Sequence, residues 1–160
     1  MDIEVLKFGG SSLASANEMR KVSDVLLARR QQQRIVVCSA MGGITNDLIH
    51  IGLKASRGDA SFRTSIEGLE NRHMQVALDL GLVGAEGTLP SELQARLGEM
   101  KALCEGLFLI KELSDKSMDQ LVSFGERMAV PLVAGWLRVN GLSVRRIDAR
   151  DWLVTNDEFG

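Results

Sequence analysis

The sequence is poor in cysteine, and its two cysteines are not placed for a disulfide framework or a metal site. Cys38 and Cys104 stand far apart, and neither belongs to a CxxC or a Cys/His motif. Structural zinc sites and redox motifs require such spacings. We therefore expect both cysteines to be reduced and buried, acting as small hydrophobic side chains, and we expect no metal site built from protein ligands.

Long apolar runs are also missing. No stretch approaches the roughly 20 residues that a helix needs to cross a bilayer. The segment 1–4 carries two acidic side chains, whereas a signal peptide begins with basic ones. From these two features we expect a cytoplasmic protein without a membrane partner.

The chain has no large excess of either charge. It contains 19 basic and 21 acidic residues without blocks of like charge, and its formal net charge is −2. Nucleic-acid-binding domains usually display a basic patch, so we expect no nucleic-acid partner. The 160 residues, 45% of them hydrophobic, suffice for one globular domain with a core.

The phosphate-binding fingerprints of common nucleotide folds are absent as well. The chain has no GxGxxG motif and no Gly-Lys pair. The missing Gly-Lys pair excludes a Walker A loop, and the missing GxGxxG motif weakens a Rossmann dinucleotide-binding interpretation. A phosphate site in this chain would have to use its glycines differently.

What the sequence does contain is a strand, a glycine turn and a helix, twice in succession. The predicted strands, turns and helices are 3–8, 9–12 and 15–33, then 35–38, 41–46 and 48–53. The second strand is wholly apolar, which is typical of a central parallel strand covered on both faces. Such repeated units predict an α/β fold with a mainly parallel sheet.

The middle of the chain, 57–111, changes to helical spacing. Apolar residues recur every three or four positions on two stripes joined by a glycine-rich loop at 81–90. The members of these stripes are Phe62, Ile66, Leu69, His73, Val76 and Leu80, then Leu93, Leu97, Met100, Cys104 and Leu107. We interpret this segment as a helical insertion and the stripes as packing surfaces.

The last part of the chain predicts one more helix and one more strand. The helix should begin near Ser114 and run toward residues 140–141, with a kink at Pro131 or a break near Gly125, because proline removes a helical hydrogen bond. The segment 142–147 is then predicted as a third strand and 149–153 as a short helical turn.

Ligands of parallel α/β sheets bind at the carboxyl ends of strands, where both glycine turns lie. In the first turn, Lys7 stands beside Gly9 and Gly10. Glycines let backbone N–H groups approach phosphate oxygens, and the ammonium would neutralise charge on a transferred group. On spacing alone, an ordinary strand-end lysine explains the pattern at least as well.

The second turn is surrounded by small polar residues. Ser39, Thr45 and Asn46 could hold a compact polar ligand at the start of the following helix. Thr45 and Asn46 are equally typical of helix caps, and each of them alone is better explained in that way.

A third candidate site residue, Glu126, interrupts an apolar stripe next to Gly125. Its carboxylate could bind an ammonium group. A solvated carboxylate that pairs locally with Arg127 or Lys116 explains the pattern as well, and without further information both interpretations stay open.

Taken together, these motifs resemble those of the aspartate kinases of the amino acid kinase family. They occur in the same order and spacing, and they read KFGGSSLA at 7–14, VVCSAMGGITN at 36–46 and SFGERM at 123–128. The closing segments 147–150 and 155–160 are also similar, so the resemblance covers essentially the whole chain. Ser11 stands where many members have threonine, a change that keeps the hydroxyl group.

The resemblance implies a three-layer α/β/α sandwich that transfers the γ-phosphoryl group of ATP to the β-carboxylate of L-aspartate, the first step of lysine, threonine and methionine biosynthesis. The carboxylate is ionised at neutral pH and needs no general base. Mg²⁺ would be carried by the nucleotide, and the full-length enzyme would be a homo-oligomer. The implied site residues are Lys7 for catalysis, Lys7, Phe8, Gly9 and Gly10 for ATP, and Ser39, Thr45 and Glu126 for aspartate.

Family members continue well beyond 160 residues. The resemblance thus implies that 1–160 is the amino-terminal, amino-acid-binding part of a catalytic domain, from an enzyme that is either monofunctional or fused to a homoserine dehydrogenase. We expect this part alone to bind nucleotide weakly and to lack appreciable kinase activity. Two alternatives stay open: a kinase acting on glutamate, acetylglutamate or a nucleoside monophosphate, and a non-catalytic ligand-binding module.

Overall fold

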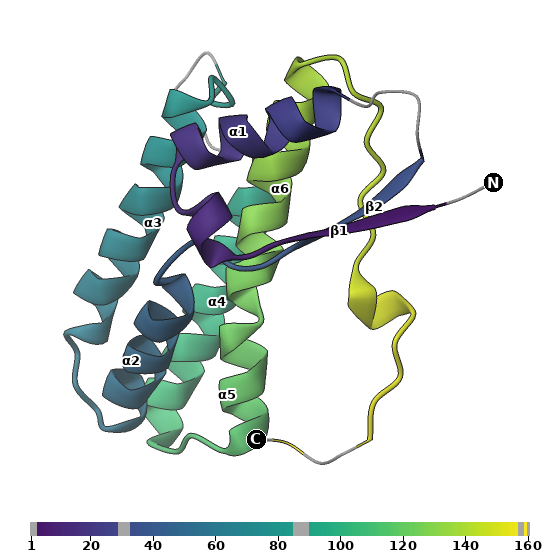
Figure 1. Ribbon diagram of the computed structural model, residues 1–160. Coiled ribbons are helices and arrows are strands. Elements are labelled where there is room, and N and C mark those ends of the chain that lie inside the picture. The colour runs from purple at the N-terminus through teal and green to yellow at the C-terminus, as the bar shows by residue number, and fades with distance from the viewer. Residues whose placement is uncertain (1–2, 29–32, 85–89, 157–158, 160) are drawn as a thin grey trace.

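The computed structural model describes residues 3–28, 33–84, 90–156 and 159. Two parallel strands rest against a set of packed helices (Figure 1). The elements, in chain order, are β1 (Glu4–Phe8), the 3₁₀ helix η1 (Gly10–Leu13), α1 (Ala16–Leu27), β2 (Arg34–Cys38), α2 (Ile44–Ser56), α3 (Phe62–Asp79), α4 (Ser91–Ile110), α5 (Asp115–Val122), α6 (Phe124–Val139) and the 3₁₀ helix η2 (Ala149–Asp151).

The sheet is parallel, as predicted. β1 and β2 pair in register, from Glu4 opposite Arg34 to Phe8 opposite Cys38. The two carboxyl ends therefore lie side by side, and the glycine turns that follow them begin at the same edge. In Figure 1 this edge lies close to the start of α2.

Only one face of the sheet is covered within the described residues. Leu6 and Val36 pack against the helical core, whereas Val5, Ile35 and Val37 are 62%, 49% and 45% exposed. The expectation that the second strand is covered on both faces is therefore wrong for the part of the chain described here. The alternation of exposure along both strands follows from helices packing on a single side.

The two helical stripes are confirmed. Every residue predicted on them is buried, and α2 packs against both α3 and α4. His73 belongs to this core and is fully buried, as expected of a packing residue. None of the described helices is long and apolar enough to cross a bilayer.

The helix predicted from Ser114 toward residues 140–141 is divided in two. Ser114 caps α5 by accepting a hydrogen bond from the Ser117 N–H over 3.2 Å. The break falls at Ser123, two residues before Gly125, and α6 continues through the buried Pro131.

The third strand predicted for 142–147 is wrong. Exposure alternates along this segment as in a strand, and Leu142 and Val144 pack against the core. A strand also needs a neighbour to pair with its backbone, and β1 and β2 pair only with each other among the described residues. The helical turn predicted after it is confirmed by η2.

The first predicted helix ends earlier than expected. α1 stops at Leu27, while its predicted end at 31–33 falls largely on residues 29–32, which lie outside the described part of the chain. Residues 157, 158 and 160 of the closing motif also lie outside it.

Candidate functional site

The first glycine turn lies beneath the side chain of Lys7. Lys7 is exposed at the end of β1, and its Nζ lies 3.6 Å from the position that a Cβ on Gly9 would occupy. The turn then closes into η1 through a hydrogen bond from the Ser12 N–H to the Gly9 carbonyl over 3.0 Å. A cationic group thus lies close to a glycine backbone that carries no side chain.

The two glycine turns are in direct backbone contact. A Cβ on Gly10 would lie 3.1 Å from the Ala40 carbonyl oxygen, and one on Gly42 would lie 3.2 Å from the Gly10 carbonyl oxygen. Such distances leave little space for a side chain at either position. The turns therefore form one continuous surface at the edge of the sheet, further joined by the Ser39 N–H, which donates to the Phe8 carbonyl over 3.0 Å.

The start of α2 presents free backbone donors at this surface. Its N-cap is Gly43, whose φ of 84° lies in the left-handed region and which has no side chain to cap the helix. Thr45 and Asn46 are exposed, and their N–H groups have no acceptor among the described residues. Neither residue occupies the N-cap position, so the capping interpretation is wrong, and the positive end of the helix dipole is open to an anion.

Glu126 reaches the same surface from α6. Its Oε1 accepts a hydrogen bond from the Ala40 N–H over 3.2 Å, while Oε2 has no partner among the described residues. The approach is close because Gly125 has no side chain: a Cβ there would lie 2.7 Å from the Ala40 Cβ. One carboxylate oxygen is fixed by the turn and the other is left for a ligand.

The two local partners considered for Glu126 are engaged elsewhere. Arg127 forms an ion pair with Glu99 of α4 and stacks over the Phe124 ring at 4.2 Å. Lys116 lies over the Phe159 ring at 5.3 Å. The interpretation of Glu126 as a carboxylate paired with a neighbour in sequence is therefore wrong.

The structure thus gathers the predicted site residues around one edge. Lys7, Gly9 and Gly10 belong to the first turn, and the half-buried Ser39 follows β2 directly. Thr45 lies in the first turn of α2, and Glu126 contacts the glycine turn between β2 and α2. Phe8 differs from the others, since its side chain packs into the core and leaves only its backbone at the edge.

Two further participants could not be found from sequence patterns. The Ala40 N–H, which holds Glu126, is a backbone group without a residue signature. Arg72, on α3, donates to the Gly42 carbonyl over 2.8 Å and lies on a helix whose spacing predicted only packing. In both cases the signal is a contact between segments distant in the chain.

Neither a metal-ligand cluster nor a reactive thiol is found among the described residues. They contain no group of three His, Cys, Asp or Glu side chains that could hold a metal ion. Burial raises the pKa of the Cys38 thiol to about 11 and that of the Cys104 thiol to about 12. Cys104 is fully buried and Cys38 is partly buried, and neither has the low pKa of a reactive thiol.

Comparisons with known proteins relate this site to a family. The model of the amino acid kinase family matches residues 2–158. Aspartokinase 1, chloroplastic, of Arabidopsis thaliana is 35% identical over 159 residues, which are 97% of this chain and 27% of that protein. The bifunctional aspartokinase/homoserine dehydrogenase 2 of the same plant is 27% identical over 95% of this chain and 17% of its own length.

The structural comparison agrees. The crystal structure of E. coli aspartokinase III in complex with aspartate and ADP matches 99% of this chain and 34% of its own, with a TM-score of 0.84 and 30% sequence identity. The same enzyme in complex with lysine and aspartate gives a TM-score of 0.82. The chain therefore spans about a third or less of the length of the relatives it matches.

Proposed function

The chain belongs to the amino acid kinase family, and from this premise we propose that it supplies the amino-acid-binding part of an aspartate kinase. The reaction moves the γ-phosphoryl group of ATP to the β-carboxylate of L-aspartate and yields aspartyl phosphate and ADP. The contact of Glu126 with the second glycine turn carries this proposal, because it joins an acidic group to an anion-binding edge. A substrate with one ammonium and two carboxylates needs both.

Glu126 and the start of α2 would bind opposite ends of aspartate. The free Oε2 of Glu126 is suited to accept a charge-assisted hydrogen bond from the α-ammonium group. The N–H and hydroxyl of the exposed Thr45, together with the N–H of Asn46 and the hydroxyl of Ser39, are suited to carboxylate oxygens. Their separation along one edge would orient the β-carboxylate toward the first turn.

Lys7, Gly9 and Gly10 would bind the phosphates. The reaction brings together two anions, so catalysis depends on neutralising charge and on alignment. The Lys7 ammonium beside Gly9 is placed to stabilise charge on the transferred group. Mg²⁺, which accompanies the nucleotide, would supply further positive charge at the phosphate oxygens.

Kinetics on the product of the complete gene test this proposal. We expect ADP release that depends on aspartate, and no release with glutamate or acetylglutamate. The substitution Glu126→Gln removes the charge that binds the α-ammonium, so the kcat/KM for aspartate should fall about 10- to 100-fold. Glu112→Gln changes an exposed carboxylate in the connection between α4 and α5 and serves as the control.

Two results would overturn the proposal. One is turnover with another acceptor in place of aspartate. The other is an equal effect of the two glutamate substitutions. Residues 1–160 expressed alone should show no appreciable turnover, because they make up about a third or less of the matched relatives. Calorimetry on this piece with aspartate and with ATP measures whether it binds either ligand although it does not transfer the phosphoryl group.

A further inference from the structure

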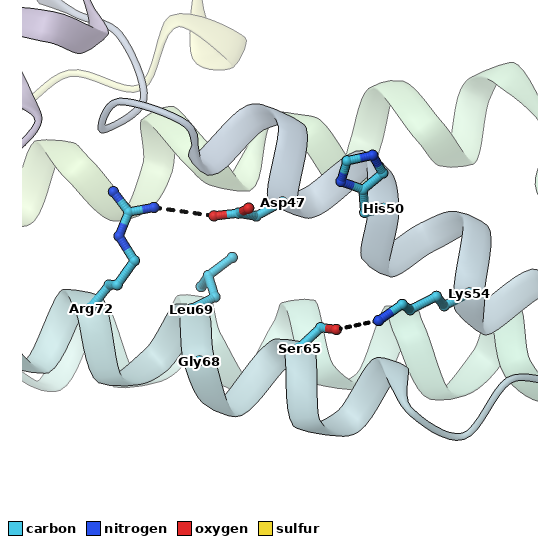
Figure 2. A pocket seen from close by; sticks show the side chains of 7 residues that line it. All are labelled: Asp47, His50, Lys54, Ser65, Gly68, Leu69 and Arg72. Atoms are coloured by element: carbon cyan, nitrogen blue, oxygen red, sulfur yellow. Dashed lines mark hydrogen bonds and ion pairs between the residues drawn. The ribbon is translucent and has the colours of Figure 1, made fainter.

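Arg72 lies on the wall of a pocket that opens between α2 and α3. The pocket has a volume of about 420 Å³, and Figure 2 shows the residues around it. They come from one face of each helix and are Asp47, His50, Lys54, Ser65, Gly68, Leu69 and Arg72. At one end Lys54 Nζ donates to Ser65 Oγ over 2.9 Å, and at the other end Arg72 meets Asp47.

The guanidinium of Arg72 connects both sides of the second glycine turn to α3. Nη2 donates to the Gly42 carbonyl over 2.8 Å, and Nη1 donates to Asp47 Oδ2 over 3.1 Å. Gly42 precedes the helix start, and Asp47 lies in the first turn of α2. The residues between these two contacts include Thr45 and Asn46, whose N–H groups are free among the described residues.

The segment is anchored by the buried Met41 and Ile44, which are joined by a hydrogen bond from the Ile44 N–H to the Met41 carbonyl over 3.0 Å, but the two glycines between them carry no side chain. Gly42 and Gly43 give the backbone wide freedom, and the N-cap has no side-chain hydrogen bond. Gly42 of this turn contacts the first glycine turn, and the Ala40 N–H just before it donates to Glu126. Arg72 holds the Gly42 carbonyl, which neither of those contacts engages.

The arrangement indicates positioning and not direct binding. Both terminal nitrogens of Arg72 already donate to protein oxygens, and its side chain is 42% exposed. An exposed ion pair of this kind contributes little to global stability. A bidentate contact to two points of one bend is nevertheless an effective way to fix its geometry.

We propose that Arg72 is a positioning residue, which holds residues 42–47 so that Thr45 and the start of α2 face the amino-acid substrate. This inference rests on the proposed function. Loss of Arg72 would let the bend relax and would weaken aspartate binding. The nucleotide side of the site, built on Lys7 and the first turn, would be affected much less.

The test compares substitutions in the product of the complete gene. Arg72→Gln removes the charge and the two-point contact, while Arg72→Lys keeps the charge but has a single donor nitrogen. Arg63→Gln is the matched control: Arg63 lies on the same helix, is 45% exposed, and makes a two-point contact with Glu105 of α4 instead of with the bend. The readouts are the KM values for aspartate and ATP, kcat, and hydrogen exchange at the Ile44 and Asp47 amides, whose N–H groups donate to the Met41 and Gly43 carbonyls.

We expect Arg72→Gln to raise the KM for aspartate about 10- to 100-fold and to leave the KM for ATP within about twofold. Arg72→Lys should recover part of the loss, and Arg63→Gln should resemble the wild type. Exchange at the Ile44 and Asp47 amides should be faster in Arg72→Gln alone. Equal shifts in both KM values, or no difference between the two glutamine variants, would overturn the inference.

The exchange experiment separates this inference from the proposed function. If the wild type shows no turnover with aspartate, the proposed function fails. Faster exchange at the Ile44 and Asp47 amides in Arg72→Gln would then still support the positioning role. Unchanged exchange would contradict it whatever the substrate is.

Discussion

The Ala40 N–H donates a hydrogen bond to Glu126 Oε1 over 3.2 Å, although 86 residues separate them in the chain. This contact places an acidic side chain of α6 on the glycine turn that follows β2. It is possible because Gly125 leaves the surface of α6 bare where it meets Ala40. The candidate site therefore depends on how α6 packs, and a change in that packing should be felt in ligand binding.

Gly125→Ala tests this dependence. The new Cβ would lie 2.7 Å from the Ala40 Cβ, which is fixed to the backbone, so either α6 or the turn must move. We expect a loss of about 1–3 kcal/mol in the free energy of unfolding and weaker aspartate binding. Urea denaturation and calorimetry measure the two effects.

Gly98→Ala is the control for that substitution. Gly98 lies inside α4, and a Cβ there would meet nothing within 4 Å. Alanine should therefore stabilise the protein by up to about 1 kcal/mol through its higher helix propensity. If Gly125→Ala also proved neutral or stabilising, the close packing of α6 on the turn would be contradicted.

His73 should make the fold sensitive to mild acid. Its Nδ1 donates to the Leu69 carbonyl over 2.8 Å, Nε2 is buried without a partner among the described residues, and burial lowers the pKa of the imidazole below its ordinary 6.5. The unfolded chain therefore takes up a proton before the folded one does. Stability should be full above about pH 6.5 and fall as the pH drops, by at most about 1.4 kcal/mol per unit.

The variant His73→Leu should remove most of this acid sensitivity, and His50→Leu should keep it, because the His50 side chain is exposed on α2. Urea denaturation at pH 7.5 and pH 5.5 provides the comparison. An unchanged pH dependence in His73→Leu would show that other groups cause it.

The two cysteines should react slowly with thiol reagents. Burial raises their pKa values to about 11 and about 12, so at pH 8 only about one in a thousand Cys38 thiols is ionised, and still fewer of Cys104. We expect labelling of the folded protein by a disulfide reagent to be at least about 100-fold slower than labelling in denaturant. Rapid labelling of one cysteine in the folded state would contradict the packing described for it.

Ser23 should contribute to stability through Trp136. The indole Nε1 donates to the buried Ser23 Oγ over 3.0 Å, which joins α6 to α1. Ser23→Ala leaves that N–H without its partner, so we expect a loss of about 1–2 kcal/mol. Ser143→Ala, at an exposed position, is the control, and equal losses in the two variants would show that the bond contributes nothing measurable.

Local patterns predicted much of this fold. The parallel strands, the buried stripes of α3 and α4, the start at Ser114 and the turn at η2 all follow from residue spacing. Each of these features depends on neighbours in sequence. The two glycine turns are predictable for the same reason, because both directly follow short apolar runs.

The predictions that were wrong concern features that depend on partners distant in sequence. The segment 142–147 has the alternating exposure of a strand but no neighbouring strand among the described residues. The strand that contains Val37 is apolar, as a strand covered on both faces would be, although one face of the sheet is exposed within the described residues. The hydrogen bond from Arg72 to the Gly42 carbonyl joins two segments that are 30 positions apart, and no local residue spacing predicts it. Residue patterns report propensity and periodicity, whereas these outcomes are decided by what packs nearby.

A crystal structure of the complete gene product with aspartate and ADP tests the central claim most directly. The account predicts the α-ammonium of aspartate within hydrogen-bonding distance of Glu126 Oε2, its carboxylates at Thr45 and the start of α2, and the phosphates beside Lys7. Aspartate bound elsewhere, for example in the pocket between α2 and α3, with Glu126 facing solvent, would contradict it.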